Sequence, residues 1–125
     1  MASVDERKAI VEQYLKLVSS GTADEIMALY APDGTLEDPV GTEPKVGREE
    51  IGAFYRSFES MEISTNLREV RASGDAAVAF AFDVVTKLPD SAMKVSAIEV
   101  MTFDDAGLIT SMKAYWSPET DVEMS

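Results

Sequence analysis

The sequence predicts an α+β fold, in which N-terminal helices pack on a strongly curved, mainly antiparallel sheet and enclose a cone-shaped pocket. Three observations support this fold class. Helical periodicity fills the first half of the chain, whereas alternation of apolar and polar residues fills the second half. The predicted strands also exceed the usual length of about 5–6 residues, which fits a bent sheet. A chain of 125 residues is expected to form one domain, residues 1–125.

The first predicted helix begins at a capping box, because Glu6 follows the N-cap Ser3 by three residues. Gly21 supplies its C-terminal stop. Between these positions, apolar residues recur at helical spacing and define the face that we expect to be buried. These residues are Val4, Val11, Tyr14, Leu15 and Val18.

Two more helices are predicted before the main sheet. Thr22 and Glu25 repeat the capping box at the start of a short helix. This helix is expected to turn Tyr30 inward and to end at Pro32. A third helix starts near Gly47, and its apolar residues lie at i, i+3, i+4 and i+7. They are Ile51, Phe54, Tyr55 and Phe58.

Strands are predicted where apolar and polar residues alternate. A short strand leads into Asp38, and four longer strands follow the third helix. We expect them from residue 63 to a turn at 73–75, and then over residues 76–88, 93–103 and 108–116. Residues 118–125 are interpreted as a tail that is ordered only if it docks on the rest of the chain.

The composition excludes several kinds of chemistry. The chain has no cysteine, so it has no disulfide, thiolate nucleophile or cysteine metal site. It has no histidine, which removes the commonest general base and most zinc sites. Acid–base catalysis must therefore use Asp, Glu, Lys or Tyr.

The net charge of −12 argues against nucleic acid and anionic membranes as partners, because phosphate binding needs clustered Lys and Arg. It favours a neutral or cationic ligand. The N-terminus lacks the apolar segment of a secretory signal, and no stretch approaches the roughly 20 apolar residues of a membrane span. We therefore expect a soluble, cytoplasmic protein.

Asp38 is the first candidate for catalysis. It ends the short strand directly before Pro39 and shortly before Gly41, and these neighbours restrict its backbone. The Asp38–Pro39 bond can adopt the cis form at small cost. Because Asp, Pro and Gly are the commonest turn residues, this segment taken alone indicates a solvated turn more readily than a site.

Glu99 is a carboxyl group on an apolar strand face. It shares its parity with Val95, Ala97, Met101 and Phe103, so an unbroken strand points it inward. Burial would keep Glu99 protonated, with a raised pKa, and would make it a hydrogen-bond donor. The alternatives are a buried Glu paired with Lys or Arg, or a strand register that exposes it.

Three tyrosines are expected to supply further donors. Tyr14, Tyr30 and Tyr55 each lie on the apolar face of a predicted helix, and buried phenols need partners. With Glu99 they form a donor-rich wall in an apolar cavity, which suits an oxygen whose charge grows during a reaction. Asp38, placed across from them, is the only expected ionised base. The arrangement indicates proton abstraction next to a carbonyl, with the enolate oxygen held by a phenol and a carboxylic acid.

Several segments match one known family. They are Leu36-Glu37-Asp38-Pro39-Val40-Gly41-Thr42-Glu43-Pro44, Val11-Glu12-Gln13-Tyr14, Leu29-Tyr30-Ala31, Phe54-Tyr55, Ala79-Phe80-Ala81-Phe82 and Ser111-Met112-Lys113-Ala114-Tyr115-Trp116. Through them, residues 10–116 resemble the bacterial ketosteroid isomerases, which have the nuclear-transport-factor-type cone fold.

The resemblance implies a homodimeric isomerase of β,γ-unsaturated 3-ketosteroids that needs no metal or cofactor. It places the general base at Asp38 and the oxyanion-hole donor at Tyr14. Glu99 stands where the family pattern has an aspartic acid. A donor one methylene longer implies a displaced backbone or a wider pocket, and reduced activity or a different substrate. The expected substrate-binding residues are Tyr30, Phe54, Tyr55, Phe82, Val84, Met101, Met112 and Trp116.

Other functions remain open at this point. One is a non-catalytic binder of small hydrophobic molecules, with Glu99 marking lost activity. Another is a dehydratase or epoxide hydrolase, because one fold can host several reactions. Such enzymes usually use a histidine or an Asp–Arg pair in the pocket. The chain has no histidine, and its arginines Arg48, Arg56, Arg68 and Arg71 are expected at the surface. Glu37, Asp38 and Glu43 suggest a divalent ion, although strand alternation points Glu37 away from Asp38.

The outer face of the sheet is expected to be partly apolar, which fits a dimer interface. The residues that indicate this are Ile98, Val100 and Ile109.

Overall fold

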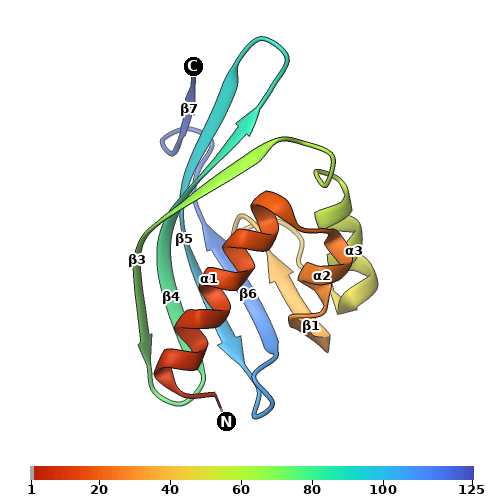
Figure 1. The fold of residues 1–125 in the computed structure, drawn as a ribbon, viewed down its shortest axis with the longest axis vertical. Coiled ribbons are helices and arrows are strands. Elements are labelled where there is room, and N and C mark those ends of the chain that lie inside the picture. The colour runs from red at the N-terminus through yellow and green to blue at the C-terminus, as the bar shows by residue number, and fades with distance from the viewer. Residues whose placement is uncertain (1) are drawn as a thin grey trace.

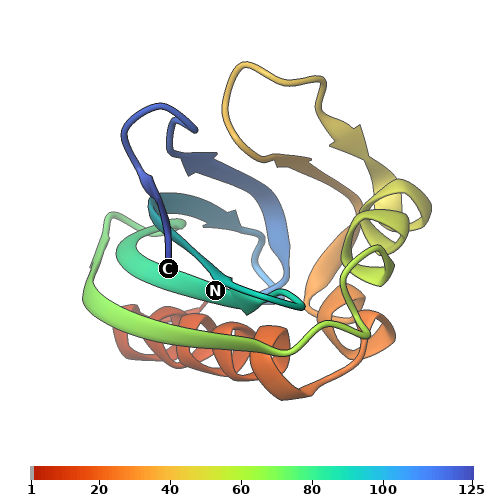
Figure 2. The ribbon, with the colours of Figure 1, turned by 90° about the horizontal axis from the view of Figure 1, so that it is seen from above.

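The computed structural model describes residues 2–125 and shows three helices beside a strongly curved sheet (Figures 1 and 2). In chain order the elements are α1 (Val4–Ser20), α2 (Ala23–Met27), β1 (Tyr30–Glu37), β2 (Lys45–Val46), α3 (Gly47–Arg56), β3 (Ile63–Ser73), β4 (Ala77–Lys87), β5 (Ala92–Phe103), β6 (Ile109–Tyr115) and β7 (Val122–Met124). The α+β prediction is therefore confirmed.

The sheet has the strand order β2-β1-β6-β5-β4-β3, and β7 pairs with β5 beside this path. All neighbouring strands are antiparallel except β1 and β6, which are parallel. In Figure 2, α1 runs along β3 and β4, while α2 and α3 lie near β1. The helices thus close one side of the curved sheet, and the core lies between them.

The caps of the first two helices form as the sequence predicts. The Ser3 hydroxyl accepts from the backbone N–H of Glu6, and the Glu6 carboxylate accepts from the backbone N–H of Ser3. Thr22 and Glu25 make the same reciprocal pair at the start of α2. Each pair satisfies backbone donors that the first turn of a helix leaves free.

Tyr30 lies in a strand, so its predicted place on a helix is wrong. α2 ends at Met27, and Tyr30 is the first residue of β1, with Pro32 inside the same strand. Parallel pairing with β6 sets this boundary: Tyr30 pairs with Ile109, and the Ile109 N–H donates to the Leu29 carbonyl at 2.8 Å. The Tyr30 side chain still points inward and is fully buried.

Ile109 is buried in the core, and its predicted place on the outer sheet face is wrong. The register of β5 and β6 shifts between Thr102, which pairs with Ser111, and Phe103, which pairs with Ile109. Thr110 is therefore an extra residue in β6. A bulge of this kind breaks the alternation of side chains and turns Ile109 to the inner face.

The C-terminal residues dock on the sheet. β7 pairs with the first half of β5, with Met93 opposite Met124 and Val95 opposite Val122. The backbones of Ala92 and Ser125 exchange hydrogen bonds at 2.9 and 3.0 Å. This pairing supplies the contact that the predicted tail needs for order.

Arg7 is a buried cation that the sequence does not reveal. Only 1% of its surface is exposed. Its guanidinium donates to the carbonyl oxygens of Ser73 at 3.1 Å, Gly74 at 2.8 Å and Ala77 at 2.6 Å. Arg7 thus ties α1 to the turn between β3 and β4.

Replacing Arg7 by methionine is expected to lower the free energy of unfolding by about 3 kcal/mol, because it leaves three carbonyl groups without their charged donor. Urea denaturation measures this loss. Arg71→Met is the matched control, because Arg71 is exposed on β3 and should change the free energy by less than about 0.5 kcal/mol. Equal losses in the two variants would contradict a structural role for Arg7.

Candidate active site

A cavity lies between the helices and the concave face of the sheet. Its volume of about 340 Å³ is within the range of small-molecule sites, and most of its wall is apolar. The residues that line it are Tyr14, Val18, Asp38, Phe54, Tyr55, Phe58, Met61, Ile63, Phe82, Val84, Thr86, Leu88, Met93, Val95, Ala97, Glu99, Ala114 and Trp116.

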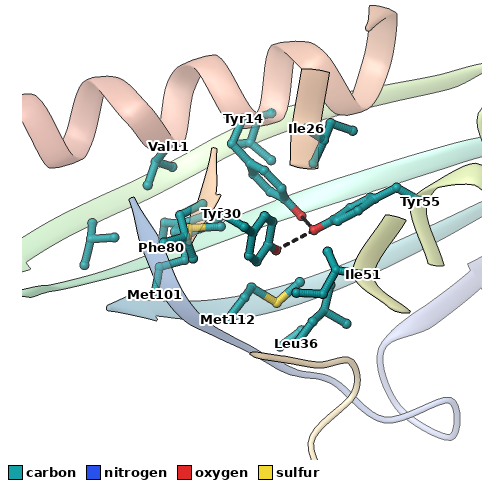
Figure 3. Packing of buried hydrophobic residues seen from close by; sticks show 14 of the residues in the cluster. Val11, Tyr14, Ile26, Tyr30, Leu36, Ile51, Tyr55, Phe80, Met101 and Met112 are labelled. Carbon is teal, nitrogen blue, oxygen red and sulfur yellow. Dashed lines mark hydrogen bonds between the residues drawn. The ribbon is translucent and has the colours of Figure 1, made fainter. Parts of the chain in front are cut away.

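Three tyrosines form a hydrogen-bonded chain at the inner end of this cavity (Figure 3). The hydroxyl of Tyr55 lies 3.0 Å from that of Tyr14 and 2.7 Å from that of Tyr30. Burial raises the pKa of all three phenols well above the ordinary value, so they stay protonated. If Tyr30 donates to Tyr55 and Tyr55 donates to Tyr14, the proton of Tyr14 is free for a ligand.

Glu99 provides a second buried acid on the cavity wall. It is 3% exposed, and its Oε1 has no hydrogen-bond partner among residues 2–125. Desolvation raises the pKa of Glu99 well above its ordinary value, and the negative charge of Asp38 raises it further. Both effects favour the neutral acid. The parity prediction is confirmed, because the pairing of β4 with β5 has no bulge.

Asp38 enters the cavity from the turn that follows β1. The Asp38–Pro39 bond is cis, and Gly41 adopts a φ of +106°, which favours glycine. The turn is held to β6 by the backbone N–H of Val40, which donates to the Ala114 carbonyl at 2.8 Å. Asp38 is thus part of a fixed turn and faces the cavity.

Two neighbours oppose the effect of burial on the pKa of Asp38. Burial raises the pKa of Asp38, whereas the hydrogen bond from Trp116 and the charge of Lys45 lower it. The indole Nε1–H of Trp116 donates to Oδ1 of Asp38 at 2.7 Å. Lys45 lies on β2, which pairs with β1, and its ammonium group lies 5.6 Å from the centre of the Phe54 ring. Asp38 is the group in this cavity best placed to be ionised.

The cavity brings together eight of the residues predicted for the site. Their side chains come from α1, α3, β4, β5 and the segments after β1 and β6. They are Tyr14, Asp38, Phe54, Tyr55, Phe82, Val84, Glu99 and Trp116.

Tyr30, Met101 and Met112 do not line the cavity, which corrects their prediction as substrate-binding residues. All three are at most 1% exposed and belong to the core. Met101 and Met112 pair across β5 and β6 and pack in the buried core (Figure 3). The sheet and helices converge there, so inward side chains pack on one another and leave no space for a ligand.

Sequence reasoning missed much of the cavity wall. Several of these residues continue the inward parity of β4 and β5 past Val84 and Glu99, which is a signal that could have found them. Phe58 continues the predicted apolar face of the third helix, whereas Met61 lies in the loop after α3, where no periodicity marks it. The missed residues are Val18, Phe58, Met61, Ile63, Thr86, Leu88, Met93, Val95, Ala97 and Ala114.

Two further findings concern the part of the chain that the structure describes. No cluster of three or more acidic side chains over residues 2–125 is arranged to hold a metal ion. No helix over the same residues is both long and apolar enough to cross a membrane.

Comparisons with known proteins identify the family of this chain. The SnoaL-like domain family matches residues 11–112. A steroid delta-isomerase from Nocardioides simplex is 49% identical over 113 residues, which are 90% of this chain and 91% of that protein. The epoxide hydrolase LasB from Streptomyces lasalocidi is 43% identical over only 47 residues, which are 38% of this chain and 17% of that protein.

The fold also matches a solved structure closely. The epoxide hydrolase/cyclase-like enzyme SalBIII, described with a role in pyran ring formation in the polyether salinomycin, superposes with a TM-score of 0.90. It is 28% identical, and the match covers 97% of each chain. The matched domain and the long alignment to a steroid delta-isomerase show that the chain belongs to the SnoaL-like domain family and, within it, to the ketosteroid isomerases.

Proposed function

We propose that this protein is a steroid delta-isomerase, which moves the double bond of a β,γ-unsaturated 3-ketosteroid into conjugation with the ketone. One observation carries the proposal: a single apolar cavity contains one carboxylate suited to act as base, Asp38, and two neutral donors, Tyr14 and Glu99. The likeness to the steroid delta-isomerase of Nocardioides simplex supports the same activity.

In the first step, Asp38 takes a proton from the carbon between the ketone and the alkene. The electrons of that C–H bond move towards the ketone and form a dienolate. In the second step, the protonated Asp38 returns the proton to the far carbon of the former alkene. The electrons return from the oxygen, the conjugated enone forms, and Asp38 is a carboxylate again.

Tyr14 and Glu99 act on the oxygen of the dienolate. Both side chains are buried and neutral, so each can donate a hydrogen bond to an oxygen that becomes negative. The orphan Oε1 of Glu99 supports this role, because a buried polar atom without a partner is unfavourable until a ligand binds. Donors already in place need little reorganisation as the charge develops.

A direct assay tests the proposal. The protein is mixed with a β,γ-unsaturated 3-ketosteroid, and the ultraviolet absorbance of the conjugated enone is followed against a heat-denatured sample. Enone formation that scales with protein concentration supports the isomerase. Steroid binding without enone formation would instead favour a non-catalytic binder on the same fold.

The hydrogen bond from Trp116 should set the acid limb of the pH profile. Only the ionised form of Asp38 accepts a proton, so kcat/KM falls as pH drops through the pKa of this carboxyl group. The indole lowers that pKa, so Trp116→Phe should raise it and move the acid limb to higher pH. Phe82→Leu, which alters the wall without touching the carboxylate, is the control. An unmoved limb in Trp116→Phe would contradict this role of the indole.

A second candidate function is the opening of an epoxide. It is favoured by the close structural match to SalBIII and by the protonated Glu99 beside Asp38. In such a reaction Glu99 gives its proton to the epoxide oxygen as the C–O bond breaks. Asp38 takes a proton from the attacking hydroxyl group or water. Conversion of a hydroxy-epoxide, with no isomerisation of the ketosteroid, would replace the first function by this one.

We also propose that two copies pair through the outer sheet face. Ile98 and Tyr115 lie opposite each other on β5 and β6 and are 51% and 48% exposed. Their apolar surface is continuous across the strand pair and suits an interface. Light scattering of the purified protein measures the assembly directly.

A further inference from the structure

The indole that binds Asp38 comes from a segment that has left the sheet. β6 ends at Tyr115, which pairs with Ile98 of β5, and Trp116 follows outside the strand. Its Nε1–H nevertheless reaches Oδ1 of Asp38 at 2.7 Å. A hydrogen bond this short needs a ring that is held in place, and strand pairing restrains the chain only up to Tyr115. The residues after Trp116 must therefore supply the rest of the restraint.

Asp121 closes a turn directly after the indole. Its Oδ2 accepts from the backbone N–H of Ser117 at 2.8 Å, and its own N–H donates to the Ser117 carbonyl at 2.9 Å. The first of these bonds holds the peptide group between Trp116 and Ser117. Because a peptide group is planar, the bond restrains the backbone of Trp116 from the side that strand pairing leaves free.

Asp121 is also attached to the central strand of the cavity wall. The backbone N–H of Ser96 on β5 donates to the Asp121 carbonyl at 3.0 Å. The next residue, Val122, begins β7 and pairs with Val95, which lines the cavity. Asp121 is therefore tied to β5 through its backbone and to Ser117 through its side chain. It connects β5 to the segment that carries the indole.

The bond from Ser117 to Asp121 is partly buried, so its loss should change the geometry of the turn. Without the carboxylate, the N–H of Ser117 must find water or another acceptor, because an unpaired buried N–H is unfavourable. Either outcome moves the peptide group next to Trp116. Hydrogen bonds weaken steeply away from linear geometry, so a small rotation of the indole weakens its bond to Asp38.

We propose that Asp121 is a positioning residue of the active site, which holds the N–H of Ser117 and thereby keeps the indole of Trp116 bonded to Asp38. This inference rests on the proposed isomerase function for the role of Asp38 as a base. Asp121 does not line the cavity, so it acts on the reaction only through Trp116.

The ionisation of Asp38 can report the indole bond. Several titratable groups on other elements also face this carboxylate. They are Lys45 of β2, Glu99 of β5, Tyr14 of α1 and Tyr30 of β1. None of them belongs to the turn at 117–121, so a change at Asp121 leaves them in place. A shift in the titration of Asp38 then reflects a change in the bond from Trp116.

The fluorescence of Trp116 tests the proposal without turnover. Trp116 is the only tryptophan, so the emission should follow the protonation of the carboxylate to which its indole donates. In Asp121→Ala the midpoint of this pH titration should move to higher pH, because a weaker bond stabilises the ionised form of Asp38 less. Asp121→Asn keeps an acceptor for Ser117 and should retain the wild-type midpoint. An unmoved midpoint in Asp121→Ala would overturn the proposal.

Glu119→Ala is the matched control for charge. Glu119 is exposed in the same turn, so its variant removes one negative charge and keeps the bond between Asp121 and Ser117. Loss of a negative charge alone lowers the pKa of Asp38, which is opposite to the expected shift. A rise in the midpoint of Glu119→Ala as large as that of Asp121→Ala would count against positioning through the hydrogen bond.

A double variant separates positioning from a general effect on the fold. The acid limb of kcat/KM is compared among Trp116→Phe, Asp121→Ala and the combination of the two, with urea denaturation to check that each is folded. Once the indole is absent, Asp121 has no ring to position, so the double variant should keep the acid limb of Trp116→Phe. A further shift to higher pH in the double variant would show that Asp121 acts by another route.

The two proposals fail separately. A raised fluorescence midpoint in Asp121→Ala, with no enone formation by the wild type, would reject the isomerase and keep the positioning role. Enone formation by the wild type, with one midpoint shared by the wild type and Asp121→Ala, would keep the isomerase and reject the positioning role.

Discussion

Replacing Asp38 by asparagine is expected to lower kcat for isomerisation by about 10³-fold, within the range of about 10²–10⁴ for a general base. The amide has nearly the same shape as the carboxylate, and its oxygen can still accept from the indole of Trp116. It cannot take a proton from carbon at a useful rate. The loss should therefore appear in kcat, with steroid binding little changed.

Stopped-flow absorbance of the conjugated enone measures kcat, and fluorescence titration measures binding. Glu37→Gln is the matched control, because Glu37 precedes Asp38 in the chain and does not line the cavity. It should retain wild-type turnover. Equal turnover by Asp38→Asn and the wild type would remove Asp38 from the role of base.

The second large effect is expected for Tyr14→Phe, which should lower kcat by about 10²- to 10³-fold. The change removes one of the two donors to the dienolate oxygen and keeps the ring that packs in the cavity wall. Because the hydrogen bond strengthens as the charge develops, kcat should fall far more than KM rises.

Tyr55→Phe distinguishes direct donation from support. Tyr55 reaches the substrate oxygen only through Tyr14 in the proposed chain, so its removal should cost less than the removal of Tyr14. Tyr115→Phe, on the exposed outer face, is the control for the loss of a hydroxyl group. A larger loss in Tyr55→Phe than in Tyr14→Phe would reverse the assigned order.

Period-2 reasoning placed side chains correctly wherever strand pairing is unbroken. Glu99 is the clearest example, because β4 and β5 pair without a shift along their length. Ile109 shows the limit, because one extra residue in β6 inverts its face. The bulge depends on how β6 pairs with β5 as much as on the sequence of β6. The sequence of β6 alone therefore does not predict it.

The alternation of side chains along a strand also predicts the sheet face on which a side chain lies. It does not predict how deep in the cone that side chain lies. Met101 and Met112 point inward as expected, yet they are buried in the core and do not line the cavity. Tyr30 shows the opposite case: its assigned element was wrong, and its phenol still joins the buried chain through Tyr55. The partners of Arg7 are backbone carbonyls, which no side-chain pattern could reveal.

The indole bond to Asp38 makes the two oxygens of this carboxylate unequal. Trp116 binds Oδ1, so in the proposed reaction Oδ2 is the oxygen that carries the proton. Because Oδ1 is fixed, Oδ2 stays on one side of the flat dienolate. The hydrogen that leaves the steroid should thus return to the same face of the steroid. The stereochemistry of the product would then follow from the one hydrogen bond that Trp116 donates to Asp38.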